Sequence, residues 1–319
     1  FFRITSIVSS PINKFSLFYI SDLNYNIFFS FLSSMNIMIE PNITIVTAFF
    51  DIGRGDWTKD KGHPGYLHRP TSQYFDYFKN LAELDNPFIV YTSSDFVEKI
   101  LEIREGKPTT VISIDLKEKF SSVLERIDVI QNDEHFRSKV DDKQLRNPEY
   151  WSPYYVLVNN LKSYFVYESI KENLITTDLV AWLDFGYCRD KKTLSKLRQW
   201  NYSFDTSKIH LFTIAEEFEF SEANVLNSIL GNVPYIIGGG IVGSVEKWPD
   251  FYNLILSSQM ELLNKNLVDD DQGVYLLSKL RNPDMIQLNY LGKNNWFGIF
   301  KKFRQTNGLL DKIKLFLNF

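Results

Sequence analysis

The apolar run Leu179-Val180-Ala181-Trp182-Leu183 leads directly into Asp184-Phe185-Gly186. An apolar run of this length is typical of a buried β-strand. Open α/β sheets bind their ligands at the C-terminal ends of the strands, which is where Asp184 follows. A carboxylate in that place can hold a divalent cation, and the cation can hold a diphosphate. This stretch therefore predicts a nucleotide-sugar site in which Asp184 binds Mn²⁺ or Mg²⁺ and helps to bind the diphosphate.

Strands and helices alternate along the part of the chain that precedes this run. Apolar runs predict strands over residues 43–50, 87–92 and 110–114. Apolar residues at helical spacing predict helices over residues 71–84 and 96–103. A β-α-β-α-β pattern is typical of a parallel sheet covered by helices, so the predicted fold class is α/β. Later elements are expected at 154–172 (a long helix), 209–214 and 235–237 (strands), and 251–263 and 273–280 (helices).

Composition limits the classes of protein that this chain can belong to. With 319 residues, 44% hydrophobic and 23% charged, it can bury a core, and its net charge of −4 gives no argument for nucleic acid as a partner. The one cysteine, Cys188, excludes internal disulfides and indicates a reducing compartment, so we expect a cytoplasmic location. No apolar stretch reaches the ~18 residues of a membrane span.

The two ends of the chain differ from its middle in composition. Residues 1–40 are rich in Ser, Asn and Phe and predict an accessory extension, which ends at Pro41. Residues 41–292 are expected to form the nucleotide-sugar and acceptor domain. Residues 293–319 are basic and carry apolar residues at helical spacing, which predicts an amphipathic tail whose residues 296–319 contact a membrane surface at the inner face of the cytoplasmic membrane. The alternative is a terminal helix packed on the domain.

Polar residues follow the first predicted strand, where a doubly wound sheet would place a nucleoside. There Asp51 and Arg54 are expected to hold the nucleotide, because a guanidinium can grip phosphate with two hydrogen bonds. Asp56 belongs to the same predicted nucleotide-sugar site, and Trp57 can stack on a base or a sugar. The alternative is a solvated loop with an ordinary salt bridge. Further phosphate-binding candidates are Arg69 and Lys162.

Two later segments add candidates for the sugar. Residues 238–244 match Gly-x-Gly-x-x-Gly, but Trp248-Pro249 interrupts the helix that a dinucleotide site needs. We expect instead that Gly239 and Gly240 allow close approach of a sugar to the backbone, with a tight turn as the alternative. Acids at 269–271 precede an amphipathic run and can simply cap a helix.

The functional interpretation of the acidic segment assigns it to catalysis. Asp271, or its neighbour Asp269, would act as general base for the attacking hydroxyl or lie beneath the reacting sugar carbon. Gln272 would hydrogen-bond the acceptor or the donor sugar.

Two blocks, residues 43–57 and 182–187, resemble the HtrL/YibB/WlaTC family of bacterial proteins, and the resemblance extends over about residues 43 to 292. It implies a context in lipopolysaccharide and surface-glycan gene clusters. The chain is also similar, more loosely, to GT-A glycosyltransferases, which carry a strand-end metal Asp, a later Gly-rich strand and an acid-Gln segment that opens a helix. Asp184, residues 239–243 and Asp271-Gln272 follow in that order. This similarity implies a GT-A-like, mainly parallel mixed sheet.

The chain departs from that pattern at the metal motif, whose usual form is Asp-x-Asp. Gly186 replaces the second acid, and no C-terminal His completes the shell, so Asp190 or water would have to substitute. The predicted function is transfer of a sugar from a nucleoside diphosphate donor to a glycan or glycolipid acceptor, such as a growing lipopolysaccharide or other surface glycan. The alternatives are a non-catalytic glycan- or partner-binding protein on the same fold and a sugar nucleotidyltransferase.

Overall fold

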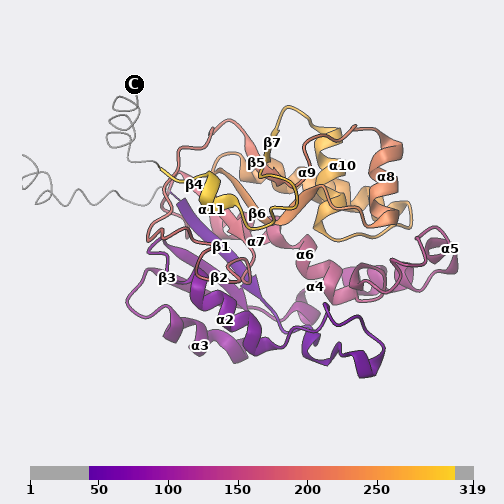
Figure 1. The fold of residues 1–319 in the computed structure, drawn as a ribbon, viewed down its shortest axis with the longest axis horizontal. Coiled ribbons are helices and arrows are strands. Elements are labelled where there is room, and N and C mark those ends of the chain that lie inside the picture. The colour runs from indigo at the N-terminus through magenta and orange to yellow at the C-terminus, as the bar shows by residue number, and fades with distance from the viewer. Residues whose placement is uncertain (1–42, 306–319) are drawn as a thin grey trace, which may run out of the picture. The chain divides into compact units, whose positions relative to one another are not determined.

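The structure, a computed structural model, describes residues 43–305 (Figure 1). Its strands are β1 (Ile43–Phe49), β2 (Phe88–Thr92), β3 (Thr109–Ser113), β4 (Leu179–Leu183), β5 (Ile209–Thr213), β6 (Ile236–Ser244) and β7 (Ile286–Tyr290). Its α-helices are α2 (Thr71–Leu81), α3 (Val97–Ile103), α4 (Leu116–Gln131), α5 (Glu134–Arg137), α6 (Pro153–Asn160), α7 (Lys162–Lys171), α8 (Glu222–Gly231), α9 (Trp248–Asn264), α10 (Asp271–Arg281) and α11 (Ile299–Lys302). Short 3₁₀ turns are η1 (Arg54–Asp56), η2 (Lys59–Lys61), η3 (Ser94–Phe96) and η4 (Pro148–Tyr150).

The described strands form one seven-stranded sheet in the order β3-β2-β1-β4-β6-β5-β7. β6 runs antiparallel to β4 and β5, and the other neighbouring strands are parallel. The predicted α/β class with a mixed, mainly parallel sheet is therefore confirmed. From β1 the chain continues to β2 on one side, while β4 lies on the other side. Such a change of direction opens a crevice at the C-terminal ends of β1 and β4.

Helices cover both faces of the sheet (Figure 1). On one face, α2, α3 and α11 pack against the strands, and on the other face lie α4, α6, α7, α8, α9 and α10. β1 shows why the sheet is buried on both sides: Ile43 and Ile45 contribute to the first core, and Val46 and Ala48 to the second. Because successive side chains of a strand point to opposite faces, a strand between two helical layers must be apolar throughout.

The expected long helix over 154–172 is two helices. α6 ends and α7 begins around Leu161, whose ψ of −2° departs from regular helix geometry. The break makes Lys162 the first residue of α7. An apolar pattern that continues through a short break gives no sign of it, so sequence alone predicted one element.

The strand expected over residues 235–237 continues through the glycines as β6, and none of its glycines has a positive φ. The tight-turn alternative is therefore wrong. Pro249 lies in the first turn of α9. A proline is tolerated there because the first turn has no backbone N–H partner to lose, so Trp248-Pro249 begins the helix that it seemed to interrupt. Strand β7 was not predicted.

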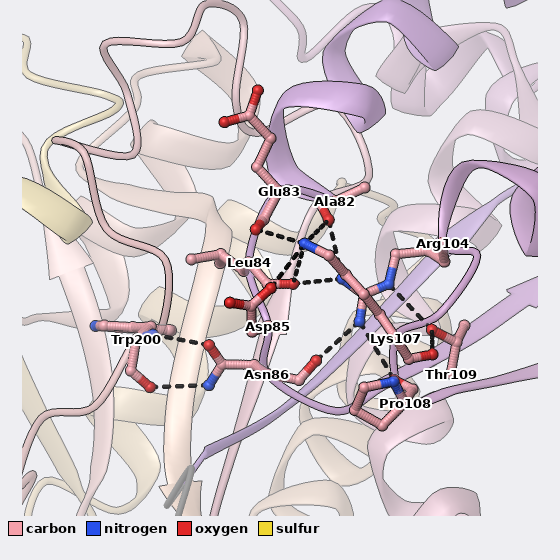
Figure 2. A network of polar contacts seen from close by, with 10 residues as sticks. All are labelled: Ala82, Glu83, Leu84, Asp85, Asn86, Arg104, Lys107, Pro108, Thr109 and Trp200. Carbon is pink, nitrogen blue, oxygen red and sulfur yellow. Dashed lines mark hydrogen bonds and ion pairs between the residues drawn. The ribbon is translucent and has the colours of Figure 1, made fainter. Parts of the chain in front are cut away.

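A network around Arg104 fixes the connection from α2 to β2 (Figure 2). The buried guanidinium donates to the carbonyls of Ala82, Leu84, Asn86 and Pro108 and to Thr109 Oγ1. In the same loop the Asn86 side chain donates to the carbonyls of Ile43 and Trp200 and accepts from the Trp200 amide. These bonds satisfy buried carbonyls that have no partner in a regular element. They fasten β1, β2 and the loop after β4 to one another.

The described part of the expected tail, residues 293–305, packs onto the domain. Ile299 and Phe300 are fully buried, and the Trp200 indole donates to the Phe303 carbonyl at 2.7 Å. Phe300 and Phe303, expected as an apolar patch of a membrane-binding tail, instead fill the core beside Tyr187 and Trp200. For these residues the alternative of a packed terminal segment is the correct one. The rest of the tail, 306–319, and the extension 1–40 lie outside the described residues.

Within residues 43–305, no helix has both the length and the apolar character needed to cross a lipid bilayer.

Candidate functional site

A cavity of about 460 Å³ lies where β1 and β4 end and where β6 begins. It is lined by the segment after β1, the turn after β4, Gly238 and Gly239 of β6, the start of α10 and residues of α6 and α7. The predicted site residues that line it are Asp51, Arg54, Arg69, Lys162, Asp184, Gly239, Asp271 and Gln272. Segments far apart in the sequence thus meet at the crevice that the sheet order opens.

Lys162 connects two of the predicted carboxylates. Its ammonium lies 2.8 Å from Asp184 Oδ1 and is also paired with Asp271 Oδ2. Its remaining contact is the Gly238 carbonyl at 2.9 Å, so all three donors of the ammonium are used. Lys162 is 4% exposed. Burial would lower its pKa, but the two carboxylates outweigh burial, and the net pKa is raised.

One carboxylate oxygen of Asp184 is hydrogen-bonded to a residue of β4, and the other faces the cavity. The Trp182 indole donates to its Oδ1 at 3.0 Å, and its backbone N–H donates to the Gly239 carbonyl. Its Oδ2 has no hydrogen-bond donor among residues 43–305, and its side chain is 40% exposed. The carboxylate therefore keeps one oxygen for a ligand in the cavity.

The start of α10 presents three buried carboxylates. Asp270 Oδ1 accepts from the Gln272 amide and Asp269 Oδ2 from the Gly273 amide, so both cap the helix as acids at N-termini do. Asp271 is free of the capping role and points to Lys162. Burial raises the pKa of Asp271 to about 7, against the opposing charge of Lys162. A carboxyl with a pKa near neutrality suits general acid–base chemistry.

Asp270, which also lines the cavity, and Glu149, which does not, extend this acidic region. Burial raises the pKa of Asp270 to about 7 and that of Glu149 to about 6. The charge of Glu149 raises the pKa of Asp270 further, whereas a hydrogen bond with Asp270 lowers the pKa of Glu149. Burial, with the charge of Asp270, raises the pKa of Asp269 well above its usual range. Several carboxyls so close together disfavour simultaneous ionisation.

Gly238 is glycine because the Asp271 side chain occupies the space that a Cβ would take. Gly239 lines the cavity under Tyr187, and a Cβ there would lie 3.0 Å from the tyrosine ring. Gly240 does not line the cavity, and the space over it is filled by Ile299. The close approach of a sugar expected at Gly240 is therefore wrong, because the Ile299 side chain covers that glycine. At Gly239, which lines the cavity, it stays a prediction.

Three arginines form another part of the cavity wall. Arg54 is buried, and its guanidinium donates to the Leu67 carbonyl and to the Tyr74 hydroxyl. Arg69 donates its backbone N–H to the Arg54 carbonyl, which brings the two residues together. Arg189, in the turn after β4, completes the wall. Burial lowers the pKa of Arg189, and the nearby charges of Arg69 and Arg54 lower it further.

Besides Gly240, three predicted residues do not line the cavity. Asp56 is exposed and pairs with Lys61 at 2.9 Å, which is the ordinary salt bridge of the alternative reading. Trp57 is buried, and its ring packs against Trp151 and lies under the Arg54 guanidinium, so it supports the arginine and is not open for stacking. Asp269 is likewise occupied as a helix cap.

Other residues of the cavity were missed from the sequence. They include Arg189, Asp270, Tyr74, Tyr155 and Asn159. Arg189 follows Asp184 by five positions, and a charged residue so close to a strand-end acid was a usable signal. Tyr155 and Asn159 lie on one face of α6, but nothing in a helical pattern shows which face meets a site on another element.

The carboxylates of the cavity do not by themselves make a metal site. Among residues 43–305 no cluster of three His, Cys, Asp or Glu side chains is placed to hold a metal ion. Gly186 offers no side-chain ligand, and the ammonium of Lys162 fills the space between Asp184 and Asp271. Divalent cations need several oxygen ligands, so the present donors fit a cation poorly. Mn²⁺ or Mg²⁺ stays a prediction.

Fold and site define a three-layered α/β protein with a charged cleft at the switch point of its sheet. The family described as "Bacterial protein of unknown function (HtrL_YibB)" matches residues 41–305. Protein HtrL of Escherichia coli (strain K12) is 48% identical over 283 residues, which cover 88% of this chain and 99% of that protein. The chain therefore belongs to the HtrL_YibB family, as its resemblance implied.

Among solved structures, mouse xyloside xylosyltransferase 1 in its apo form is similar at a TM-score of 0.39 and 11% identity, over 77% of this chain and 84% of that chain. A likeness of that strength carries no argument about activity.

Proposed function

We propose that this protein is a glycosyltransferase that moves a sugar from a nucleoside diphosphate sugar to a hydroxyl of a glycan or glycolipid acceptor. The observation that carries the proposal is the meeting of Asp184, Lys162, Asp271 and three arginines in one cavity at the C-terminal ends of β1 and β4. In sheets of this kind such a crevice is where nucleotides bind. A cavity of about 460 Å³ is in the size range of small-molecule sites.

Two parts of the cavity lining fit the two ends of such a donor. The arginine wall consists of Arg54, Arg69 and Arg189, and the acidic wall consists of Asp184, Asp270 and Asp271. The arginine wall suits the diphosphate, because guanidinium groups bind phosphate oxygens with charge-assisted, often paired, hydrogen bonds. The acidic wall suits the reacting sugar, where carboxylates can accept hydroxyl protons or stabilise positive charge at the anomeric carbon. The surface-glycan context implied by the family resemblance supports an acceptor of the lipopolysaccharide type.

In the proposed reaction the bond between the anomeric carbon and the diphosphate oxygen breaks, and that oxygen keeps the electron pair. The acceptor hydroxyl oxygen forms the new bond to the anomeric carbon. Its proton passes to a carboxylate of the acidic wall, for which Asp271, with a pKa of about 7, is the best placed. Asp184 Oδ2 is the oxygen free to hold a sugar hydroxyl.

The first test is binding. Wild type is screened by thermal shift against UDP-, GDP- and dTDP-sugars, with a CMP-sugar as a monophosphate comparison and nucleoside triphosphates as probes for a nucleotidyltransferase. A ligand of the folded state raises the melting temperature by mass action. Asp184→Asn is the site variant, and Asp142→Asn, an exposed acid outside the cavity, is its matched control.

We expect a shift with one class of diphosphate sugar that is reduced in Asp184→Asn and kept in Asp142→Asn. A shift with triphosphates alone would favour nucleotidyl transfer. Binding without any release of nucleoside diphosphate, with acceptor glycans present, would favour a non-catalytic binding protein. No shift with any of these ligands contradicts the proposal.

A further inference from the structure

Arg54, Arg69 and Arg189, called here the arginine wall, come from three separate segments and line one cavity. Arg54 opens η1 after β1, Arg69 precedes α2, and Arg189 follows β4. The sheet brings these segments together, since β1 and β4 are parallel neighbours. Three like charges in one cavity repel one another, so their clustering has an electrostatic cost that an anion would remove.

None of the three forms a salt bridge with a carboxylate within residues 43–305, although the charge of Arg54 also acts on the buried Glu149. Arg54 is held by a carbonyl and a hydroxyl and lies over the Trp57 ring at 5.2 Å, and Arg189 lies over the Phe297 ring at 4.7 Å. Arg281 behaves differently, because Glu222 and Glu261 neutralise it. Arg54 is buried and Arg69 is half-buried, whereas Arg189 is exposed. Buried arginines are usually paired, so a buried arginine without a salt bridge, beside two further arginines that face the same cavity, is unusual for a purely structural role.

On the acidic side of the cavity, carboxylates already neutralise the positive charge of Lys162. Lys162 satisfies Asp184, Asp271 and the Gly238 carbonyl at once, and it occupies the position between the two carboxylates that a bridging cation would need. A leaving diphosphate must have its negative charge countered by some group. Of the cationic side chains among the described residues that line the cavity, those of the arginine wall form no salt bridge.

We propose that the arginine wall is the subsite for the diphosphate of the donor, so that guanidinium groups take over the neutralising role of a divalent cation and donor binding requires no metal. This inference rests on the proposed function and adds its diphosphate subsite. When the bond to the anomeric carbon breaks, the diphosphate oxygen that keeps the electron pair gains negative charge. Arg69 and Arg189 then strengthen their hydrogen bonds to the departing nucleoside diphosphate.

The test uses free nucleoside diphosphates (UDP, GDP, CDP, ADP and dTDP) titrated calorimetrically into the whole chain. Each titration is done once in EDTA and once with Mn²⁺ or Mg²⁺. The variants are Arg69→Met, Arg189→Met and the double variant. These two arginines are chosen because neither is buried, whereas Arg54 is buried and its loss endangers folding. Arg146→Met, an exposed arginine outside the cavity, is the matched control, and melting curves check that each variant folds.

One nucleoside diphosphate is expected to bind in EDTA about as tightly as with Mn²⁺. The double variant should bind it about 10-fold to 100-fold more weakly, as expected when charge-assisted hydrogen bonds are lost, and Arg146→Met should bind it unchanged. Binding that needs Mn²⁺ or Mg²⁺ and disappears in EDTA overturns this inference and leaves the proposed function standing. Binding in EDTA that the folded double variant keeps also overturns it. No binding under either condition overturns both this inference and the proposed function.

Discussion

Gly238 and Asp271 are matched: the carboxylate of Asp271 lies where a side chain on Gly238 would begin. The match joins β6 to the start of α10 and places Asp271 against the Lys162 ammonium, which also donates a hydrogen bond to the Gly238 carbonyl. One glycine thus determines the position of the carboxylate that we assign to the acceptor proton. The relationship explains why a strand interior tolerates a residue that usually weakens strands.

Gly238→Ala should therefore displace Asp271 and lower both stability and transfer. A methyl group forced against a buried side chain costs about 1–3 kcal/mol. The control is Gly231→Ala at the end of α8, where a Cβ meets only an ordinary contact of 3.5 Å with Val233. Urea denaturation and a nucleoside diphosphate release assay give the two readouts. If Gly238→Ala is as stable and as active as Gly231→Ala, Asp271 is not held as described.

Lys162→Met should destabilise the fold strongly at pH 8. It leaves Asp184 and the buried Asp271 without their shared cation, and breaking a buried pair costs about 3–5 kcal/mol. Lys171→Met, which removes an exposed lysine paired with Glu168, is the control and should cost less than about 1 kcal/mol. Adding Asp271→Asn to Lys162→Met should recover part of the loss. Equal effects of the two lysine variants would show that the buried bridge contributes nothing.

Arg104→Met should destabilise the protein without affecting ligand binding. The substitution leaves several buried carbonyls in the α2–β2 connection without a donor, at a cost of about 3 kcal/mol or more. The cavity is formed by other segments, so a bound nucleotide should be held as in wild type. Chemical denaturation and calorimetry measure the two properties, with Arg146→Met as the exposed control. A loss of ligand affinity in a variant that still folds would connect this network to the site.

Stability should fall between about pH 4 and about pH 7 through Asp270 and Glu149. Their folded pKa values, about 7 and about 6, lie above the values of unfolded carboxyls, chiefly because of burial. The folded state therefore binds more protons in this window, and its free energy of unfolding decreases as pH rises. Exposed carboxyls with lowered pKa values, such as Glu261 and Glu222, act in the opposite direction.

For that reason the comparison is with Asp270→Asn, measured by urea denaturation across the same pH window. In Asp270→Asn the free energy of unfolding should decrease less steeply with rising pH than in wild type, whereas Asp142→Asn should reproduce the wild-type profile. An Asp270→Asn profile parallel to wild type would mean that Asp270 titrates normally in the folded protein.

The sequence was informative where the chemistry is local. β1, β2 and β4 are apolar runs buried on both faces, and such runs with a polar stop can be recognised without knowledge of any partner. For the same reason Asp51, Arg54 and Asp184 were correctly expected at strand ends near one another. β7 was missed because its residues alternate at the sheet edge, with Ile286 buried and Gln287 exposed, which makes a weak pattern.

What the sequence could not predict depends on contacts between distant segments. Ile299 over Gly240, Asp271 over Gly238 and the buried positions of Phe300 and Phe303 are set by the meeting of elements, which leaves no trace in local periodicity. Lys162 was expected to bind phosphate, but the break at Leu161 turns its side chain between two carboxylates. The role of Lys162 could not be predicted because both of its carboxylate partners lie more than twenty residues away in the sequence.

The most direct test of the account is turnover of the donor class found by the binding screen. Wild type is incubated with that nucleotide-sugar and lipopolysaccharide-type acceptors, and released nucleoside diphosphate and glycosylated product are measured. We predict that wild type and Asp142→Asn release nucleoside diphosphate and form glycosylated product at the same rate. Asp271→Asn should form both at least about 100-fold more slowly, in line with the loss of a general base. Full activity in Asp271→Asn, or no product with any bound donor, would contradict the account.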